Sequence, residues 1–249
     1  ITAELAEIFG ERESWLIARK NDVAALGFNA DEVERYEAFD KPIVLVVGSG
    51  RPIAYHTLEP QVDAILHLWQ PGVEAGHALA KLIFGLENPS GKLAMTFPRS
   101  VGQIPIFYNR NQSARVGDKS WSGLYQDIES TPMYEFGHGL SYTTFAYEDL
   151  TINKQTLEAK VKVINTGTRT GKETLLWYVV DPEARITQPL KKLKNFEKIE
   201  LEPGEVQMVS FHIQPEKHLS YVDSNGAMHV EPGDFHIEVG GLRASFTLD

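Results

Sequence analysis

The carboxylates between residues 31 and 40 are the side chains of this sequence best suited to acid–base chemistry. Four acidic residues precede Asp40 in this polar stretch: Asp31, Glu32, Glu34 and Glu37. A carboxyl group can protonate a leaving group and later activate water when its surroundings raise its pKa toward neutrality. The alternative interpretation is that these carboxylates are simply solvated, as acidic side chains in polar segments usually are.

Other kinds of chemistry have little support. The chain has no cysteine, which excludes disulfides, thiolate catalysis and cysteine-based zinc sites. The histidines at 56, 67, 77 and 138 do not have the spacing of metal ligands, so each is expected to be structural or exposed. Gly48-Ser49-Gly50 is followed by Arg51-Pro52 instead of a helix start and a third glycine, so no nucleotide site is expected there.

Composition limits the class of protein and of partner. The 249 residues suggest roughly two domains, and 42% hydrophobic with 23% charged residues is typical of a soluble globular protein. The formal net charge of −10 argues against nucleic acid as a partner and suits a neutral substrate such as a sugar. No apolar run approaches the roughly 20 residues that cross a bilayer, so no membrane partner is expected. The sequence leaves homo-oligomerisation open.

The first part of the chain has the pattern of alternating strands and helices. Residues 42–47 are an uninterrupted β-branched run and residues 63–69 are a second apolar run, both typical of strands buried on two faces. Residues 74–84 carry apolar side chains at helical spacing, and Gly85 can end that helix. Residues 93–97 are expected to form one more strand. This pattern predicts an α/β sandwich with a mostly parallel sheet.

From about residue 147 the pattern changes to short strands separated by turns. Apolar residues alternate at 157, 159, 161 and 163, and two Glu-Pro-Gly turns each precede a strand. About seven strands without a helix predict a β-sandwich of about 100 residues. Trp69 and Trp177 lie in apolar runs and are expected in the core, whereas the lysines at 191, 192 and 194 are expected along a solvated strand edge. We therefore predict domains at 1–145 and 146–249.

Many segments, in this order and spacing, resemble the C-terminal half of family 3 glycoside hydrolases of the β-glucosidase type. In the first domain the matching segments are residues 41–46, 50–52, 69–72, 88–93, 96–105 and 134–145. In the second domain they are residues 165–167, 171–173, 189–196 and 231–233, which are similar to a fibronectin type III-like domain. The resemblance implies an α/β-sandwich domain followed by that fibronectin type III-like domain.

The resemblance also implies a reaction. Family 3 enzymes hydrolyse β-linked sugars with retention, using two carboxyl groups about 5–5.5 Å apart across the scissile bond. A (β/α)8 barrel supplies the nucleophile, and a loop of the α/β domain supplies the acid/base glutamate. Glu37-Ala38-Phe39-Asp40 is similar to the Glu-Gly-aromatic-Asp of many members, so Glu37 is the first candidate for the acid/base and Glu34 the second.

The expected partners follow from the same resemblance. They are a β-linked oligosaccharide or β-glucoside as substrate, and the barrel, either in the same original chain or in a partner chain. No cofactor is expected. The chain begins at Ile1 without an initiator methionine or a leader pattern and has no barrel, so we expect a processed or truncated piece that is inactive by itself. A periplasmic or secreted location is favoured over the cytoplasm for a bacterial source. The alternative function is a non-catalytic scaffold or carbohydrate-binding module.

Overall fold

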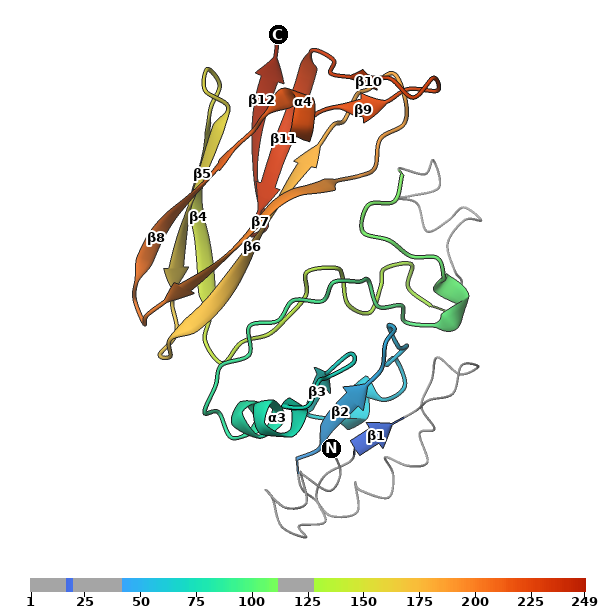
Figure 1. Cartoon of the computed structure of the whole chain (residues 1–249), viewed down its shortest axis with the longest axis vertical. Helices are drawn as coiled ribbons and strands as arrows, with labels where there is room; N and C mark the ends of the chain where they lie inside the picture. The colour runs from blue at the N-terminus through green and yellow to red at the C-terminus, as the bar shows by residue number, and fades with distance from the viewer. Residues whose placement is uncertain (1–16, 20–41, 112–127) are drawn as a thin grey trace. The chain divides into compact units, whose positions relative to one another are not determined.

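The chain forms two compact units within the residues that its computed structural model describes (Figure 1). The described residues are 17–19, for which only the backbone is discussed, 42–111 and 128–249. The first unit comprises the described residues up to 87 together with 93–106 and 128–138. The second unit comprises residues 88–92, 107–111 and 139–249. The described fold is mostly sheet with few helices.

The first unit is built on parallel strands. β2 (Val44–Gly48) pairs in parallel with β1 (Ile17–Arg19) on one side and with β3 (Ala64–His67) on the other. The strands expected at 42–47 and 63–69 are therefore confirmed, with slightly different bounds. The parallel arrangement is shown for these three strands, a smaller part of the fold than the mostly parallel sheet that the sequence predicts.

Both faces of this sheet are covered, which explains the continuous apolar runs. Val46 points to one face and packs with Leu79 of helix α3 (Ala75–Ile83). Leu45 and Val47 point to the other face, toward Tyr55 and Phe97. Because successive side chains of a strand alternate between faces, a strand buried on two faces has no polar positions.

Helix α3 agrees with the helix expected at 74–84. It begins after Glu74, buries Leu79 and Ala80, and ends where Gly85 takes a left-handed φ of 68°. The amides of Gly85 and Leu86 donate to the carbonyls of Leu82 and Lys81, as expected at a glycine-ended helix. The capping role predicted for Gly85 is confirmed.

The prediction of a strand at residues 93–97 is wrong. These residues form only an isolated antiparallel bridge between Phe97 and Tyr134. Pro98 follows directly and has no amide hydrogen with which to extend a ladder. Two short 3-10 helices complete the description of this unit, Glu59–Gln61 and Val101–Gln103.

The second unit contains a β-sandwich of two antiparallel sheets. The four-stranded sheet has the order β12-β11-β6-β7 and the three-stranded sheet has the order β4-β5-β8. In chain order the strands are β4 (Phe145–Asn153), β5 (Glu158–Asn165), β6 (Gly171–Val180), β7 (Lys192–Leu201), β8 (Val206–His212), β11 (Gly233–Val239) and β12 (Leu242–Leu248). These agree with the seven strands that the sequence predicts.

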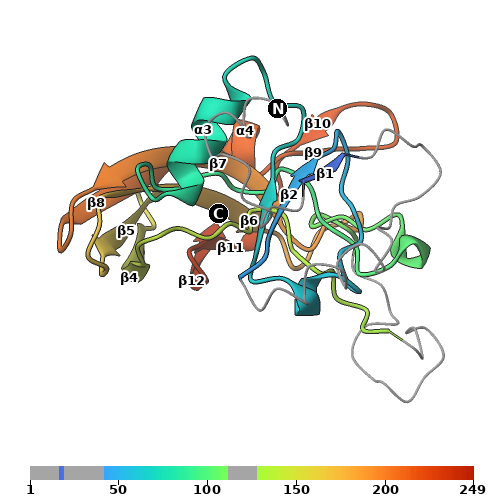
Figure 2. The same cartoon turned by 90° about the horizontal axis from the view of Figure 1, so that it is seen from below.

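A short helix and a hairpin interrupt the strand pattern. Helix α4 (Pro215–His218) is a single turn, and β9 (Tyr221–Val222) pairs with β10 (Met228–His229). Both lie at one end of the sandwich (Figures 1 and 2). The expectation of a second domain without a helix is therefore wrong, because Pro215 starts a helical turn at a position whose missing amide hydrogen costs nothing.

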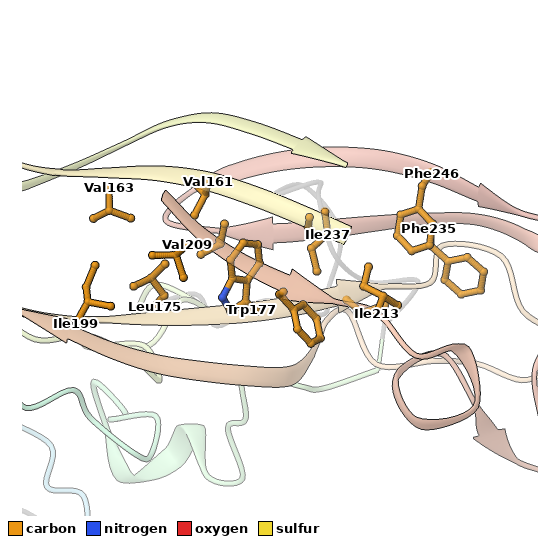
Figure 3. Close-up of a cluster of buried hydrophobic side chains, with 14 of the residues drawn as sticks. Val161, Val163, Leu175, Trp177, Ile199, Val209, Ile213, Phe235, Ile237 and Phe246 are labelled. Atoms are coloured by element: carbon orange, nitrogen blue, oxygen red, sulfur yellow. The ribbon is translucent and has the colours of Figure 1, made fainter. Parts of the chain in front are cut away.

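Trp177 lies at the centre of the sandwich core. Its side chain is fully buried, and it packs between the sheets with Leu175, Val209 and Ile237 (Figure 3). The core position predicted for Trp177 is confirmed. The alternation predicted in β5 is also confirmed, since Ala159, Val161 and Val163 face this core; Leu157 lies just before the strand with a φ of 52°.

The lysine-rich run lies on the sheet edge that the sequence predicts, but its side chains are less exposed than expected. β7 is the last strand of its sheet. Burial lowers the pKa of both Lys192 and Lys194, and the amine of Lys191 lies over the ring of Tyr178 at 4.6 Å. These lysines therefore pack their stems on the sheet instead of standing fully in water.

Residues 88–92 belong to the sandwich unit and are tied to it by side chains. The Asn88 amide donates to the Thr170 carbonyl at 3.0 Å, and its carbonyl oxygen accepts from the Ser141 hydroxyl and the Tyr142 amide, each at 2.8 Å. The Lys92 amine lies 3.1 Å from a carboxylate oxygen of Glu173, and both side chains are largely buried. We call residues 88–92 the strap.

Candidate functional site

Both candidates for the acid/base lie outside the described residues. Glu37 and Glu34 fall in the part of the chain between β1 and residue 42, so their roles stay predictions. Trp121 and Tyr125 also lie outside the described residues; both belong to the irregular stretch from residue 100 to residue 132, which we call the long connection. The described residues do include the sheet edge next to which a ligand of a parallel sheet is expected.

The carboxyl ends of β2 and β3 form this candidate site. In open parallel sheets, ligands bind outside the carboxyl ends of the strands. Here β2 runs into Gly48, Ser49 and Gly50, while β3 runs into Trp69 and Gln70. The two connections lie side by side: a Cβ on Gly48 would be 4.0 Å from the Trp69 carbonyl oxygen, and one on Gly50 would be 2.9 Å from the Gln70 amide nitrogen. A Cβ at 48 would be in ordinary contact, whereas one at 50 would require the flexible Gln70 side chain to shift. We call residues 48–51 together with 69 and 70 the carboxyl edge.

Trp69 has an unusual backbone conformation at this edge. Its φ is 56°, in the left-handed region that a bulky residue rarely adopts. Such strain persists only where surrounding contacts hold it, and it is concentrated at functional sites. The contacts are visible: the indole meets His67 edge-on at 4.5 Å and Phe97 at 5.8 Å between ring centroids. Trp69 is half-buried and packs against the core, so the core position predicted for it is only partly correct.

His67 is a titratable residue whose ring packs against Trp69. Its Nδ1 lies 2.6 Å from the hydroxyl oxygen of Tyr55, and its ring meets Phe97 edge-on at 5.0 Å. Burial lowers the pKa of His67 to about 4 and raises the pKa of Tyr55, so both groups are neutral near pH 7. The structural role predicted for this histidine agrees with these contacts.

The loop after β2 does not begin a helix. The Ser49 hydroxyl accepts from the Arg51 amide at 3.3 Å and donates to the Arg51 carbonyl at 3.1 Å, which makes a tight turn. A phosphate-binding loop of the dinucleotide type requires a helix N-terminus at this position. The turn after β2 does not provide that helix N-terminus.

The other histidines are also structural or exposed. The His138 ring stacks on Tyr134 at 4.9 Å, and its backbone carbonyl accepts a hydrogen bond from the Leu93 amide at 2.7 Å. His56 and His77 are exposed. Among the described residues, no group of three or more histidines and carboxylates is placed to bind a metal ion.

Tyr108 packs on the sandwich instead of standing free for a sugar. Its ring meets Tyr178 at 5.8 Å, and its hydroxyl accepts from the Leu193 amide at 3.4 Å. Tyr108 therefore holds its segment against the sandwich.

The sequence did not reveal the Tyr55–His67 pair. Alternation along β3 places His67 and Trp69 on one face, which is a usable signal. Tyr55 lies on an irregular segment with no periodicity, so nothing in the sequence indicates that its hydroxyl reaches His67.

The described residues form one unit with a parallel sheet and a second unit with an antiparallel sandwich. The glycosyl hydrolase family 3 C-terminal domain matches residues 6–142, and a fibronectin type III-like domain matches residues 173–242. Because the first match covers more than half of the chain, the chain belongs to glycosyl hydrolase family 3.

Named relatives agree with this assignment. A periplasmic β-glucosidase of Salmonella typhimurium is 41% identical over 220 residues, which cover 84% of this chain and 29% of the relative. A β-xylosidase of Formosa agariphila is 38% identical over 225 residues, which cover 88% of this chain and 31% of the relative. The chain therefore spans about a third of the length of these curated relatives. Its homologues are glycosidases.

Solved structures give the same result. A β-glucosidase from Listeria innocua in complex with isofagomine superposes with a TM-score of 0.85 at 31% identity, covering 94% of this chain and 36% of that chain. A β-glucosidase from Erythrobacter marinus gives a TM-score of 0.83 at 36% identity, covering 92% and 31%. In the described part of the chain, no helix has the length and apolar character needed to cross a membrane.

Proposed function

We propose that this chain is the C-terminal part of a retaining β-glucosidase-type glycoside hydrolase that removes terminal β-linked sugars. Glu37 is its acid/base, with Glu34 as the second candidate. A (β/α)8 barrel, in the same original chain or in a partner chain, supplies the nucleophile. The observation that carries the proposal is the family match over residues 6–142, together with relatives named β-glucosidase and β-xylosidase.

The division of labour follows from the chemistry of retention. The nucleophile attacks the anomeric carbon while the acid protonates the leaving oxygen, and the same group then activates water as a base. One carboxylate cannot do both tasks from one face of the sugar. A chain that carries only the acid/base is therefore inactive until it meets the barrel. The match to only about a third of each relative supports this need for a further domain.

The two domains have different tasks in this proposal. Residues 1–145 form the α/β sandwich with a mostly parallel sheet and present the acid/base beside the carboxyl edge. Residues 146–249 form the fibronectin type III-like support. Trp69, half-buried at the end of β3, is suited to pack against the C–H groups of a sugar ring. The relative named periplasmic supports a periplasmic or secreted location for the protein.

The acid/base assignment is tested by substitution in the complete enzyme. We expect Glu37→Gln to lower the rate on a substrate with a poor leaving group by about 10²–10⁴-fold. The loss should be much smaller on a substrate with a good leaving group, which departs without protonation. Glu34→Gln is the matched control and should leave both rates nearly unchanged. The opposite pattern would move the role to Glu34, and wild-type rates in both variants would remove both residues.

The need for a barrel is tested with the 249-residue chain. We expect the purified chain, checked by intact mass, to leave a chromogenic β-glucoside and β-xyloside intact, and activity to appear with the complete polypeptide. Proton NMR of the first product should show the β-anomer, because retention returns the starting configuration. Hydrolysis by the 27.9 kDa species alone would contradict the proposal. Sugar binding with no activity in the complete polypeptide would favour the non-catalytic carbohydrate-binding alternative.

A further inference from the structure

The Tyr55–His67 pair has one nitrogen whose role is not explained by core packing. Nδ1 of His67 is taken by the Tyr55 hydroxyl at 2.6 Å. Nε2 is buried, and it makes no hydrogen bond of regular geometry with the described residues. The polar backbone group that acts on the ring is that of Ser49, the residue that follows β2. Because Nδ1 faces Tyr55, Nε2 is the nitrogen left for Ser49.

The register of the sheet brings these groups together independently. His67 is paired with Val47 across the β2–β3 ladder, and the Leu68 amide donates to the Val47 carbonyl at 2.7 Å. Ser49 is therefore only two residues beyond the strand position opposite His67. The close approach of Gly48 to the Trp69 carbonyl shows that the two connections leave the sheet side by side.

The tautomer of His67 follows from these neighbours. A backbone group that favours the protonated ring acts as a hydrogen-bond acceptor, so the Ser49 carbonyl is the group we expect opposite Nε2. A neutral imidazole has one N–H, and a bare Nε2 opposite a carbonyl oxygen would be repelled. The proton therefore sits on Nε2, and Nδ1 accepts the hydrogen of Tyr55.

We propose that His67 is a positioning residue for sugar binding. The Tyr55 hydroxyl holds the ring in its Nε2–H tautomer, and the ring in turn fixes the Ser49 backbone after β2 and the Trp69 backbone after β3. In this arrangement one ring determines the shape of both halves of the carboxyl edge. The Nε2–H points to the Ser49 carbonyl, and the face-to-edge contact at 4.5 Å holds Trp69 in its left-handed conformation. The proposal rests on the proposed function only for the statement that this edge binds the sugar.

The tautomer is tested on the 249-residue chain without any substrate. Long-range ¹H–¹⁵N correlation spectra at neutral pH should show His67 with an unprotonated Nδ1 and a protonated Nε2. Tyr55→Phe should mix the two tautomers and shift the Ser49 and Gly50 amide resonances. His56→Gln, an exposed histidine next to Tyr55, is the matched control and should leave these resonances in place. A charged His67, or an Nδ1–H tautomer, would overturn the proposal whatever the enzyme's activity.

Positioning is tested by kinetics in the complete enzyme. We expect His67→Phe and Tyr55→Phe to raise KM for a chromogenic β-glucoside about tenfold while kcat changes little, because a displaced edge weakens binding in the ground and transition states alike. His67→Gln should recover most of the affinity, because its amide N–H can take the place of Nε2–H. A loss of folded protein alone lowers apparent kcat and leaves KM unchanged, so the two explanations give different results.

Two results would separate the failure of this inference from the failure of the proposed function. An inactive wild-type enzyme that binds no sugar would contradict the proposed function, while the NMR result would still decide the tautomer and the Ser49 contact. An active enzyme whose KM is unchanged in His67→Phe would overturn the positioning role even if the tautomer is as described.

Discussion

The lowered pKa of His67 makes the stability of the folded protein depend on pH, and the direction of this dependence follows from the shift. Its pKa is lowered from an ordinary value near 6.5 to about 4 by burial, so the unfolded chain binds a proton in this interval and the folded chain does not. Stability contributed by His67 is fully present above about pH 6.5 and is lost as the pH falls toward 4.

We therefore expect His67→Gln to flatten the acid side of the stability profile. Wild type should lose stability between pH 6.5 and 4, and the variant should lose less over the same range, measured as the urea midpoint at each pH. Burial also lowers the pKa of His218 in the sandwich, so part of the wild-type loss should remain in the variant. Parallel profiles for the two proteins would contradict the assignment.

Gln103 is a second residue whose burial gives a firm expectation. Its side chain is 4% exposed and makes three hydrogen bonds: its amide donates to the carbonyls of Glu129 and Thr131, and its oxygen accepts from the Arg99 amide. The bonds join residues on the two sides of the long connection. The buried side chain of Gln103 has its polar atoms satisfied by these bonds, which is how they contribute to stability.

We expect Gln103→Ala to lower the free energy of unfolding of the first unit by about 2–3 kcal/mol, because it removes three hydrogen bonds made by a buried side chain. Urea unfolding followed by far-UV circular dichroism measures the change. Gln155→Ala, at an exposed position before β5, is the control and should stay within about 0.5 kcal/mol of wild type. A Gln103→Ala midpoint equal to that of the control would mean that water replaces the lost bonds.

At the scale of elements, the sequence predicted those strands and helices whose own periodicity matches their burial. β2, α3 and β5 are apolar at the spacing that their surroundings require, so pattern and structure agree. Residues 93–97 are also mostly apolar, but they do not form a strand. Phe97 instead packs on the Tyr55 ring and forms an isolated bridge with Tyr134. The conformation of residues 93–97 depends on partners that are distant in sequence, and a local sequence pattern contains no information about such partners.

The strap is the element whose role the sequence could not reveal. Asn88-Pro89-Ser90-Gly91 has turn chemistry, which predicts a loop but not what the loop binds. Its partners, Thr170 and Glu173 among them, lie in the other predicted domain. The amine of Lys198 adds a bond to the Ser90 carbonyl at 3.0 Å.

Asn88→Ala should destabilise the sandwich by about 2–3 kcal/mol, since it removes hydrogen bonds to Thr170, Ser141 and Tyr142. The fluorescence of fully buried Trp177 during urea unfolding reports on this unit. Glu87→Ala is the neighbouring control, because Glu87 makes only an exposed ion pair with Lys81 at 3.7 Å. Equal midpoints for the two variants would show that the Asn88 side chain does not stabilise the sandwich.

At the scale of the whole molecule, the sequence predicts one domain boundary, between residues 145 and 146. In the structure, the sandwich unit is instead assembled from separate stretches of chain. The sandwich unit includes residues 88–92 and 107–111 in addition to 139–249. Sequence periodicity changes near residue 147, but periodicity does not record segments that leave one unit to pack on another. The boundary at residues 145 and 146 stays a prediction from the sequence, and an experiment on a fragment can measure which residues form a stable unit.

A fragment of residues 139–249 should fold less stably than the same sandwich inside the full chain. It lacks Lys92, which pairs with largely buried Glu173, and Tyr108, which covers Tyr178. We expect its thermal midpoint to be lower by about 4–8 °C for each kcal/mol lost, measured by calorimetry. A peptide of residues 88–92 fused ahead of the fragment should recover part of the loss. An unchanged midpoint would show that the strap is dispensable.

The strap also has a consequence for the order in which the protein is made. Residues 88–92 leave the ribosome long before β6 and β7, which carry their partners Thr170, Glu173 and Lys198. β6 in turn gains its second neighbour only with β11, at residues 233–239. A nascent chain therefore carries Lys92 without Glu173 until β6 has been made, and a pause before β11 extends the period in which chaperones or proteases can bind this segment.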